Sequence, residues 1–78
     1  MSAPASNAIR PGTYRHTKSG KLYEVLGTAL HTETRELLIV YRPLYRADYE
    51  LFARPQQMFM ETVIIDGKRV PRFEKVDE

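Results

Sequence analysis

The 78-residue sequence contains no cysteine. It therefore forms no disulfide and offers no thiolate ligand to a metal, which fits a reducing compartment. No apolar segment approaches the roughly 20 residues that a transmembrane helix needs. The N-terminal segment 1–8 lacks the basic region followed by an apolar run that marks a signal peptide. These absences predict a cytoplasmic protein with no membrane partner.

Groups that support covalent catalysis are also scarce. The serines are Ser2, Ser6 and Ser19, all in the N-terminal tail or in a predicted loop. Without cysteine or a serine in a predicted strand, no nucleophile–base arrangement is recognisable. The four glycines are dispersed among predicted turns and one bulge, so there is no glycine-rich phosphate loop. We therefore expect no catalytic residue and no cofactor.

Length and charge set the scale of what remains. A chain of 78 residues has room for one domain, which buries only about 60% of its unfolded surface. The net charge of +2 is too small to imply a nucleic-acid partner by itself. Arginine outnumbers lysine eight to four, and its planar fork suits phosphate and carboxylate. The alternative is a solvated surface that happens to use arginine.

The most apolar run, 37–41, predicts the central strand of an all-β domain. A polar turn, 31–36, precedes it and Pro43 ends it or lies on its edge. The strand places two sets of side chains on opposite faces, Leu37, Ile39 and Tyr41 on one and Leu38, Val40 and Arg42 on the other. Because both faces are mostly apolar, we expect the strand to be covered on both sides, as in a barrel.

Other runs of β-branched and aromatic residues predict the neighbouring strands. These strands cover 13–16, 22–31, 51–54, 61–65 and 68–70. Gly27 indicates a bulge, and Asp66-Gly67 is typical of a type I′ hairpin turn. One helical turn is expected near 55–60, with Phe59 filling the core.

The expected fold is therefore a small barrel-like or strongly bent antiparallel sheet of about five to six strands. The ordered domain is predicted to span 10–73. A disordered tail, 1–9, precedes it, and a frayed acidic end, 74–78, follows. We expect a monomer rather than an obligate oligomer.

Six short motifs occur in one order along almost the whole chain. They are Pro11-Gly-x-Tyr-Arg-His16, Gly20-x-x-Tyr23, His31-x-Glu33-Thr34, Val40-Tyr-Arg-Pro-Leu-Tyr45, Arg54-Pro55-x-x-Met-Phe59 and Pro71-Arg-Phe73. Together they resemble a bacterial family of uncharacterised small proteins, domain-of-unknown-function family 1653. The resemblance implies a small strand-rich single domain and no assigned reaction. Members often carry a glycine- or aspartate-rich segment where this chain has Arg46-Ala47, and tryptophan at Phe52.

Polar and aromatic residues within these motifs are candidates for ligand binding. The candidates are Tyr14, Arg15, His16, Tyr23, His31, Glu33, Arg42, Tyr45 and Arg54. Arg42 follows an apolar face of the central strand, where a charge is expected to be paired. It either forms a structural ion pair with Glu24 or Glu61, or it points into a cleft and binds an anion. Tyr41 and Tyr45 are either core or rim aromatics or stacking platforms.

Histidine chemistry is the other option that the sequence offers. His31-x-Glu33 with His16 supplies two histidines and a carboxylate, a combination found in zinc sites. The spacing matches no metal motif, and both histidines flank turns, so we expect ordinary surface roles and no metal. Acid–base chemistry by His31 with Glu33 is possible in principle, although two side chains flanking a turn are no catalytic signature.

Three functions compete at this point. The first is a non-enzymatic binding module for single-stranded nucleic acid or a nucleotide, with Arg15, Arg42 and Arg54 taking phosphate and tyrosines stacking bases along one open face. The second is a pocket protein for a small anionic metabolite, with weak acid–base chemistry from His31 and Glu33. The third is an interaction domain that pairs an exposed strand edge with a protein partner.

Overall fold

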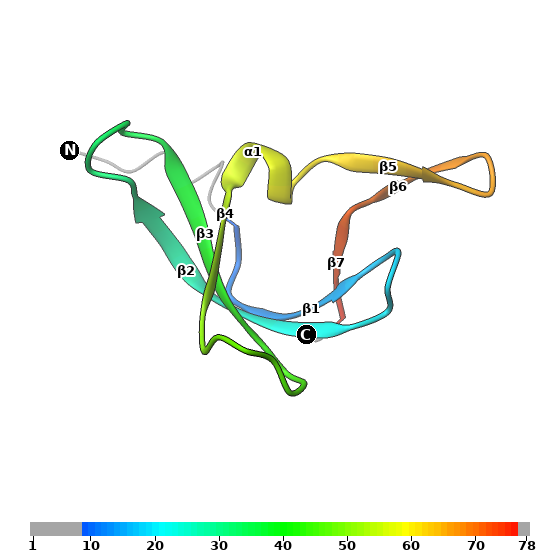
Figure 1. Cartoon of the computed structure of the whole chain (residues 1–78). Helices are drawn as coiled ribbons and strands as arrows, with labels where there is room; N and C mark the ends of the chain where they lie inside the picture. Colours follow the sequence, from blue (N-terminus) through cyan, green and yellow to red (C-terminus); the bar gives the residue numbers. More distant parts are fainter. Residues whose placement is uncertain (1–8, 77–78) are drawn as a thin grey trace.

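The structure, a computed structural model, describes residues 9–76. Figure 1 shows strands throughout and one short helix. The elements in chain order are β1 (Gly12–His16), β2 (Leu22–Leu30), β3 (Leu37–Pro43), β4 (Phe52–Pro55), α1 (Gln56–Phe59), β5 (Thr62–Ile65), β6 (Lys68–Pro71) and β7 (Phe73–Lys75). Five strands form one antiparallel sheet in the order β4-β3-β2-β1-β7, and β5 pairs with β6 alone.

The predicted turns and bulge account for the shape of the sheet. The pairing of β2 with β3 shifts register between Val25 and Gly27, which confirms the bulge there. Asp66 and Gly67 have φ values of 52° and 78°, as the type I′ hairpin turn requires. The bulge increases the local twist of a long hairpin, and the sheet curves around α1 in Figure 1.

Aromatic side chains dominate the interior on the concave side of this sheet. Its buried residues are Tyr14, Tyr23, Val25, Ile39, Tyr41, Phe59 and Phe73. The rings of Phe59 and Phe73 stack with centroids 4.1 Å apart and an interplanar angle of 5°. Phe59 is 1% exposed, which confirms that the helical turn places it in the core. Most other ring pairs meet edge to face, a favourable arrangement that adds to the area buried.

The central strand β3 differs from its prediction in one respect. Ile39 and Tyr41 are buried, but Leu38 and Val40 on the opposite face are only half-buried and Arg42 is exposed. The expectation that both faces are covered is therefore wrong, because the sheet bends over one layer of side chains only. Within residues 9–76 it closes no barrel, and the alternative of a strongly bent sheet describes it better.

Both ends of the ordered domain extend beyond their predicted limits. At the C-terminal end, Glu74 and Lys75 belong to strand β7, although the sequence predicted that they lie in a frayed end. Ile9 packs partly buried against the core, so packing begins before the predicted start at residue 10. The rest of the predicted tail, 1–8, and of the predicted acidic end, 77–78, lies outside the described residues.

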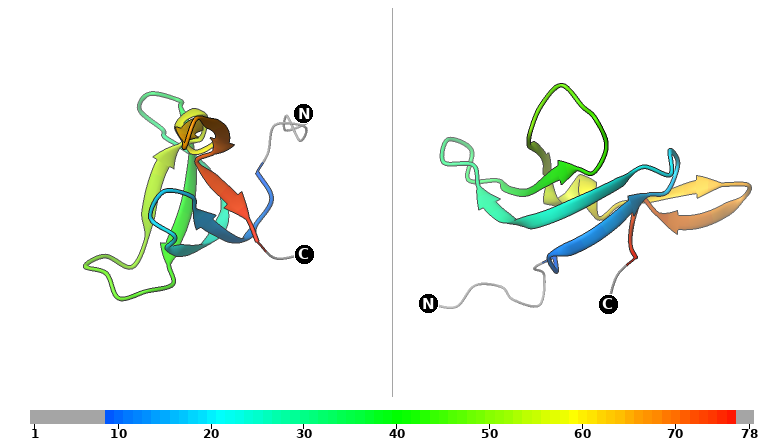
Figure 2. Two further views of the ribbon diagram at one scale, coloured as in Figure 1. Left: turned by 90° about the vertical axis from the view of Figure 1, so that its right-hand side faces the viewer. Right: turned by 90° about the horizontal axis from the view of Figure 1, so that it is seen from below.

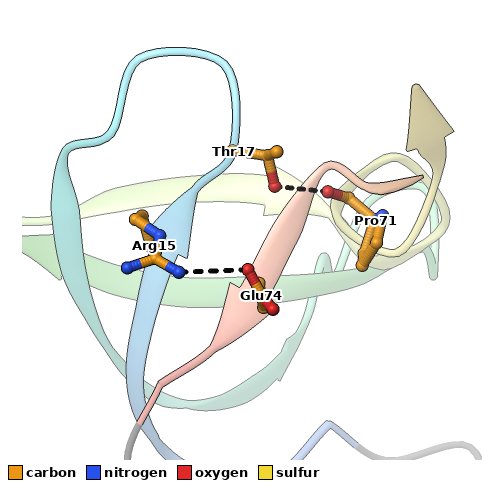
Figure 3. Close-up of polar contacts among 4 residues, drawn as sticks. All are labelled: Arg15, Thr17, Pro71 and Glu74. Atoms are coloured by element: carbon orange, nitrogen blue, oxygen red, sulfur yellow. Dashed lines mark hydrogen bonds and ion pairs between the residues drawn. The ribbon is translucent and has the colours of Figure 1, made fainter. Parts of the chain in front are cut away.

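Contacts from β1 and from Thr17, which follows it, hold the end of β6 and the start of β7 in place. Arg15 donates to Glu74 at 3.2 Å, and the Thr17 hydroxyl donates to the carbonyl oxygen of Pro71 at 2.5 Å (Figure 3). The backbone N–H of Thr17 also donates to the carbonyl oxygen of Arg72 at 2.9 Å. These contacts fix the direction in which the β5–β6 hairpin leaves the sheet, since β7 follows β6 almost immediately.

Replacing Phe59 by alanine tests whether the stacked phenylalanines hold the fold. We expect Phe59→Ala to lower the free energy of unfolding by about 3–5 kcal/mol, because it leaves a cavity in a small core. Met58 is 44% exposed, so Met58→Ala should cost well under about 1 kcal/mol. Urea denaturation followed by tyrosine fluorescence measures both. Equal losses in the two variants would contradict a structural role specific to Phe59.

Candidate functional site

Arg54 is the charged residue that the fold brings into contact with the aromatic interior. It lies on β4 two residues after Phe52, and both side chains are half-buried while Ala53 between them is exposed. Alternation along a strand therefore places Arg54 on the core-facing side. Its Nε donates to the hydroxyl of Tyr41 at 3.3 Å. Its guanidinium carbon lies 5.5 Å from the centroid of the Phe73 ring.

This position bridges two edges of the sheet. β4 and β7 are its first and last strands, yet Arg54 from β4 lies over Phe73 from β7. The curvature of the sheet thus creates a cation–π contact that no strand pairing produces.

The electrostatic environment of Arg54 differs from that of the paired arginines. Within residues 9–76, three arginines form ion pairs, namely Arg15 with Glu74 at 3.2 Å, Arg42 with Glu24 at 2.6 Å and Arg72 with Glu61 at 2.9 Å. Arg54 takes part in none of them. A half-buried guanidinium whose contacts are a hydroxyl and an aromatic face keeps donors available for an anion.

An architectural role for the same residue is also physically sound. Inward-pointing charges on edge strands discourage edge-to-edge pairing with other chains. That role requires a charge on β4 and no particular surroundings. The side chains around Arg54 therefore distinguish an anion-binding role from this architectural role.

Two tyrosines extend this cluster along the concave face. The hydroxyls of Tyr23 and Tyr45 lie 2.9 Å apart. Burial and that hydrogen bond raise the pKa of the Tyr23 hydroxyl, and the positive charge of Arg54 acts in the opposite direction. Lys21 places its Nζ 4.6 Å from the centroid of the Tyr45 ring. A second cation therefore lies on the same aromatic surface as Arg54.

His16 adds a titratable group beside these cations. Its ring meets that of Phe73 edge to face, with centroids 4.9 Å apart. Its Nδ1 accepts a hydrogen bond from the backbone N–H of Ser19 at 3.2 Å. Burial lowers the pKa of His16, and the positive charges of Arg54, Arg72 and Lys18 lower it further. Burial and the surrounding cations therefore both favour the neutral imidazole.

Positive charge collects at one end of the molecule. We call this the basic end and define it as segment 16–21, Arg54 and segment 61–72. It contains six cations, Lys18, Lys21, Arg54, Lys68, Arg69 and Arg72, against the two carboxylates of Glu61 and Asp66. The remaining described residues hold six basic and six acidic side chains. Figures 1 and 2 show the β1–β2 loop and the β5–β6 hairpin projecting from this same end.

The structure brings four of the nine predicted site residues together: His16, Tyr23, Tyr45 and Arg54. Tyr14 is buried elsewhere in the core and donates its hydroxyl to the carbonyl oxygen of Arg10 at 2.8 Å. Glu33 is exposed in the β2–β3 loop. His31 belongs to the same loop, where its Nδ1 accepts the backbone N–H of Glu33 at 3.2 Å.

Arg15 and Arg42 lie on the face opposite the cluster. Each follows a buried tyrosine in its strand, Tyr14 or Tyr41, and is itself exposed and ion-paired. The expectation that both share one open face with Arg54 is therefore corrected. For Arg42 the structure selects the first predicted alternative, an ion pair with Glu24, although this pair is exposed.

Sequence reasoning missed four members of the cluster: Lys21, Tyr41, Arg72 and Phe73. Tyr41 was assigned to the core or rim, and Phe73 was placed after the last strand. Alternation of apolar and polar residues from Phe73 onward could have indicated a strand, but three residues are too few to define a period. The proximity of Phe73 to Arg54 is a long-range effect and leaves no local pattern.

Other features offer weaker sites. An open hollow of about 540 Å³ lies at the β3–β4 loop, lined by residues that include Arg42, Arg46, Asp48 and Glu50. Because both basic and acidic side chains line it, the hollow has no excess of positive or negative charge that would attract a charged ligand. Among residues 9–76 no group of three histidine, aspartate or glutamate side chains is placed to hold a metal ion. The helix in that range has four residues, so none there is long enough to span a membrane.

Comparison with known proteins identifies similar chains whose descriptions name no activity. The model of a family described as a protein of unknown function (DUF1653) matches residues 12–75. A crystal structure of a DUF1653 protein from Bordetella bronchiseptica is 42% identical, with a TM-score of 0.81 over 87% of each chain. No functionally curated protein matches the chain.

The titration of His16 tests whether cations surround it as the structure indicates. Because the folded protein lowers this pKa, the unfolded chain binds the proton more readily, and the free energy of unfolding falls as pH drops below about 6.5. Removing a nearby cation with Arg54→Ala should raise the pKa of His16 toward its ordinary value. NMR titration of the imidazole protons measures this shift.

Arg42→Ala is the matched control, since it removes one arginine from the opposite face and should leave the titration of His16 unchanged. An unaltered His16 midpoint in Arg54→Ala would show that Arg54 does not act on this ring.

Proposed function

The chain belongs to the DUF1653 family, whose description names no reaction, and on this premise we propose that it is a non-enzymatic binding module. Its ligand is a single-stranded nucleic acid or a nucleotide, which docks on the concave face around Arg54. The observation that carries the proposal is the half-buried guanidinium of Arg54, which contacts a hydroxyl and a ring and belongs to no ion pair of residues 9–76.

The chemistry of the cluster suits phosphate. An arginine fork binds phosphate bidentately, and such charge-assisted hydrogen bonds are about twice as strong as neutral ones. The face of Phe73 and the hydroxyl of Tyr41 orient the fork in advance. Lys18 and Lys21 are exposed beside it and supply the diffuse attraction that polyanions experience.

Aromatic groups next to these cations suit a base. Tyr45 is half-buried, and its hydroxyl is held by Tyr23 at 2.9 Å. A ring fixed in this way provides a stacking surface at low entropic cost, as in other proteins that bind single strands. Lys21 over the same ring would take the adjoining phosphate.

The alternative of acid–base chemistry by His31 and Glu33 receives less support. The Nδ1 of His31 accepts two backbone N–H groups, from Glu33 at 3.2 Å and Thr34 at 3.3 Å. These bonds stabilise the turn and commit that nitrogen to a structural role. An exposed strand edge as a protein-binding surface stays a prediction, as do the cytoplasmic location and the monomeric state.

Arginine substitutions test the proposal directly. Fluorescence anisotropy of a labelled single-stranded RNA of about eight nucleotides would be measured at about 50 mM and about 200 mM salt. We expect Arg54→Ala to weaken binding about 10- to 100-fold, because a charge-assisted hydrogen bond contributes about 1.5–3 kcal/mol. Arg54→Lys, which keeps the charge but loses the fork, should fall between Arg54→Ala and the wild type.

Arg42→Ala removes the same charge from the opposite face and should change affinity less than twofold. Circular dichroism on each variant checks that the fold is retained. Equal losses in Arg42→Ala and Arg54→Ala, or an affinity that does not change with salt, would contradict the proposal.

A further inference from the structure

The β5–β6 hairpin stands apart from the rest of the fold. Its two strands of four residues pair only with each other, and Figure 1 shows the hairpin extending beyond the sheet. Ile64 near its tip is 62% exposed. A lone two-stranded hairpin is marginally stable in water. The hairpin thus projects bulky side chains into solvent at some cost in stability.

The base of the hairpin joins the Arg54 cluster. Arg72 follows β6 directly, and its charge contributes to the lowered pKa of His16. The backbone N–H of Arg72 donates to the carbonyl oxygen of Glu61 at 2.8 Å, and its guanidinium pairs with the Glu61 carboxylate at 2.9 Å. A ligand bound near His16 and Arg54 is therefore adjacent to the start of the hairpin.

The strand β6 carries two further cations away from this cluster. Lys68 pairs with Ile65 and Arg69 with Ile64, so the two cations lie on opposite faces of the hairpin. Both are exposed, and neither belongs to an ion pair of residues 9–76. Their long side chains can reach a polyanion on either side. Asp66 in the turn is the only carboxylate between β5 and β6 in the chain.

Distance separates these cations from the cluster. Arg72 and Lys68 are four positions apart along the chain, which corresponds to roughly 13 Å of extended strand. A mononucleotide whose phosphate is bound in the Arg54 cluster is too short to reach the far end of the hairpin. A strand of several nucleotides spans that distance.

We propose that the ligand of this chain is an extended single-stranded oligonucleotide, which runs from the Arg54 cluster along the β5–β6 hairpin. This inference rests on the proposed function and specifies its substrate class. Lys68 and Arg69 bind backbone phosphates from the two faces of the hairpin, and Ile64, which pairs with Arg69, contacts a base. The bound strand supplies the packing that the hairpin lacks on its own.

Charge substitution in the hairpin tests the proposal. We expect the double variant Lys68→Gln with Arg69→Gln to weaken binding of a single-stranded RNA of about eight nucleotides at least tenfold. The slope of log affinity against log salt should become shallower by about 1.4, since each lost contact contributes about 0.7. Its affinity for adenosine monophosphate should be unchanged, because that ligand occupies only the cluster.

The double variant Arg42→Ala with Arg46→Ala is the matched control, because it removes the same charge from outside the basic end. It should alter neither affinity nor the salt slope. Amide NMR spectra of both double variants verify the fold.

The outcomes separate this inference from the proposed function. Wild-type protein that binds the monophosphate and the oligonucleotide equally tightly would overturn the inference and leave the proposed function standing. Equal loss of oligonucleotide affinity in the two double variants would also overturn it, as would tighter binding of a duplex of the same sequence. Failure of the wild type to bind either ligand would remove the proposed function itself.

Discussion

The stack of Phe59 on Phe73 is the contact on which the rest of the structure depends. It joins β7 to the helical turn that follows β4. The strands β4 and β7 are the two edges of one five-stranded sheet. Edges that are separate in the pairing order meet only if the sheet bends, and the bulge at Val25 and Gly27 permits that bend. Burial of the two rings, each 6% exposed or less, contributes to the free energy that maintains the curvature.

The same curvature determines the chemistry of the concave face. Arg54 lies over Phe73 because its strand leads directly into the turn that carries Phe59. A guanidinium in this position cannot reach the carboxylates of the outer face, where Glu24 and Glu74 pair with other arginines. The fold thus separates Arg15 and Arg42, which are ion-paired on its outer surface, from Arg54, which lies inside the bend and belongs to no ion pair of residues 9–76. Our proposal of nucleic-acid binding rests on this separation.

Local features of the fold were predictable from the sequence. The apolar run 37–41, the bulge at Gly27 and the Asp66-Gly67 turn each have a short-range physical cause, and each is present. The half-buried outer face of β3 was not predictable. The sequence pattern shows which side chains on each face of the strand are apolar, but it does not show whether another layer of the protein covers that face. The cluster around Arg54 was predicted only in part, since contact between β4 and β7 depends on long-range closure of the sheet.

The central claim, that a single strand binds the basic end of this molecule, is tested most directly by amide NMR. Spectra would be recorded during titration with a mixed-sequence single-stranded RNA, at low and at moderate salt. The account predicts shifts in segments 16–21 and 68–73 and at Tyr45 and Arg54 that fade as salt rises, with no change at Arg42 or His31. Shifts confined to the outer face or to segment 46–50, or no shifts at all, would contradict it.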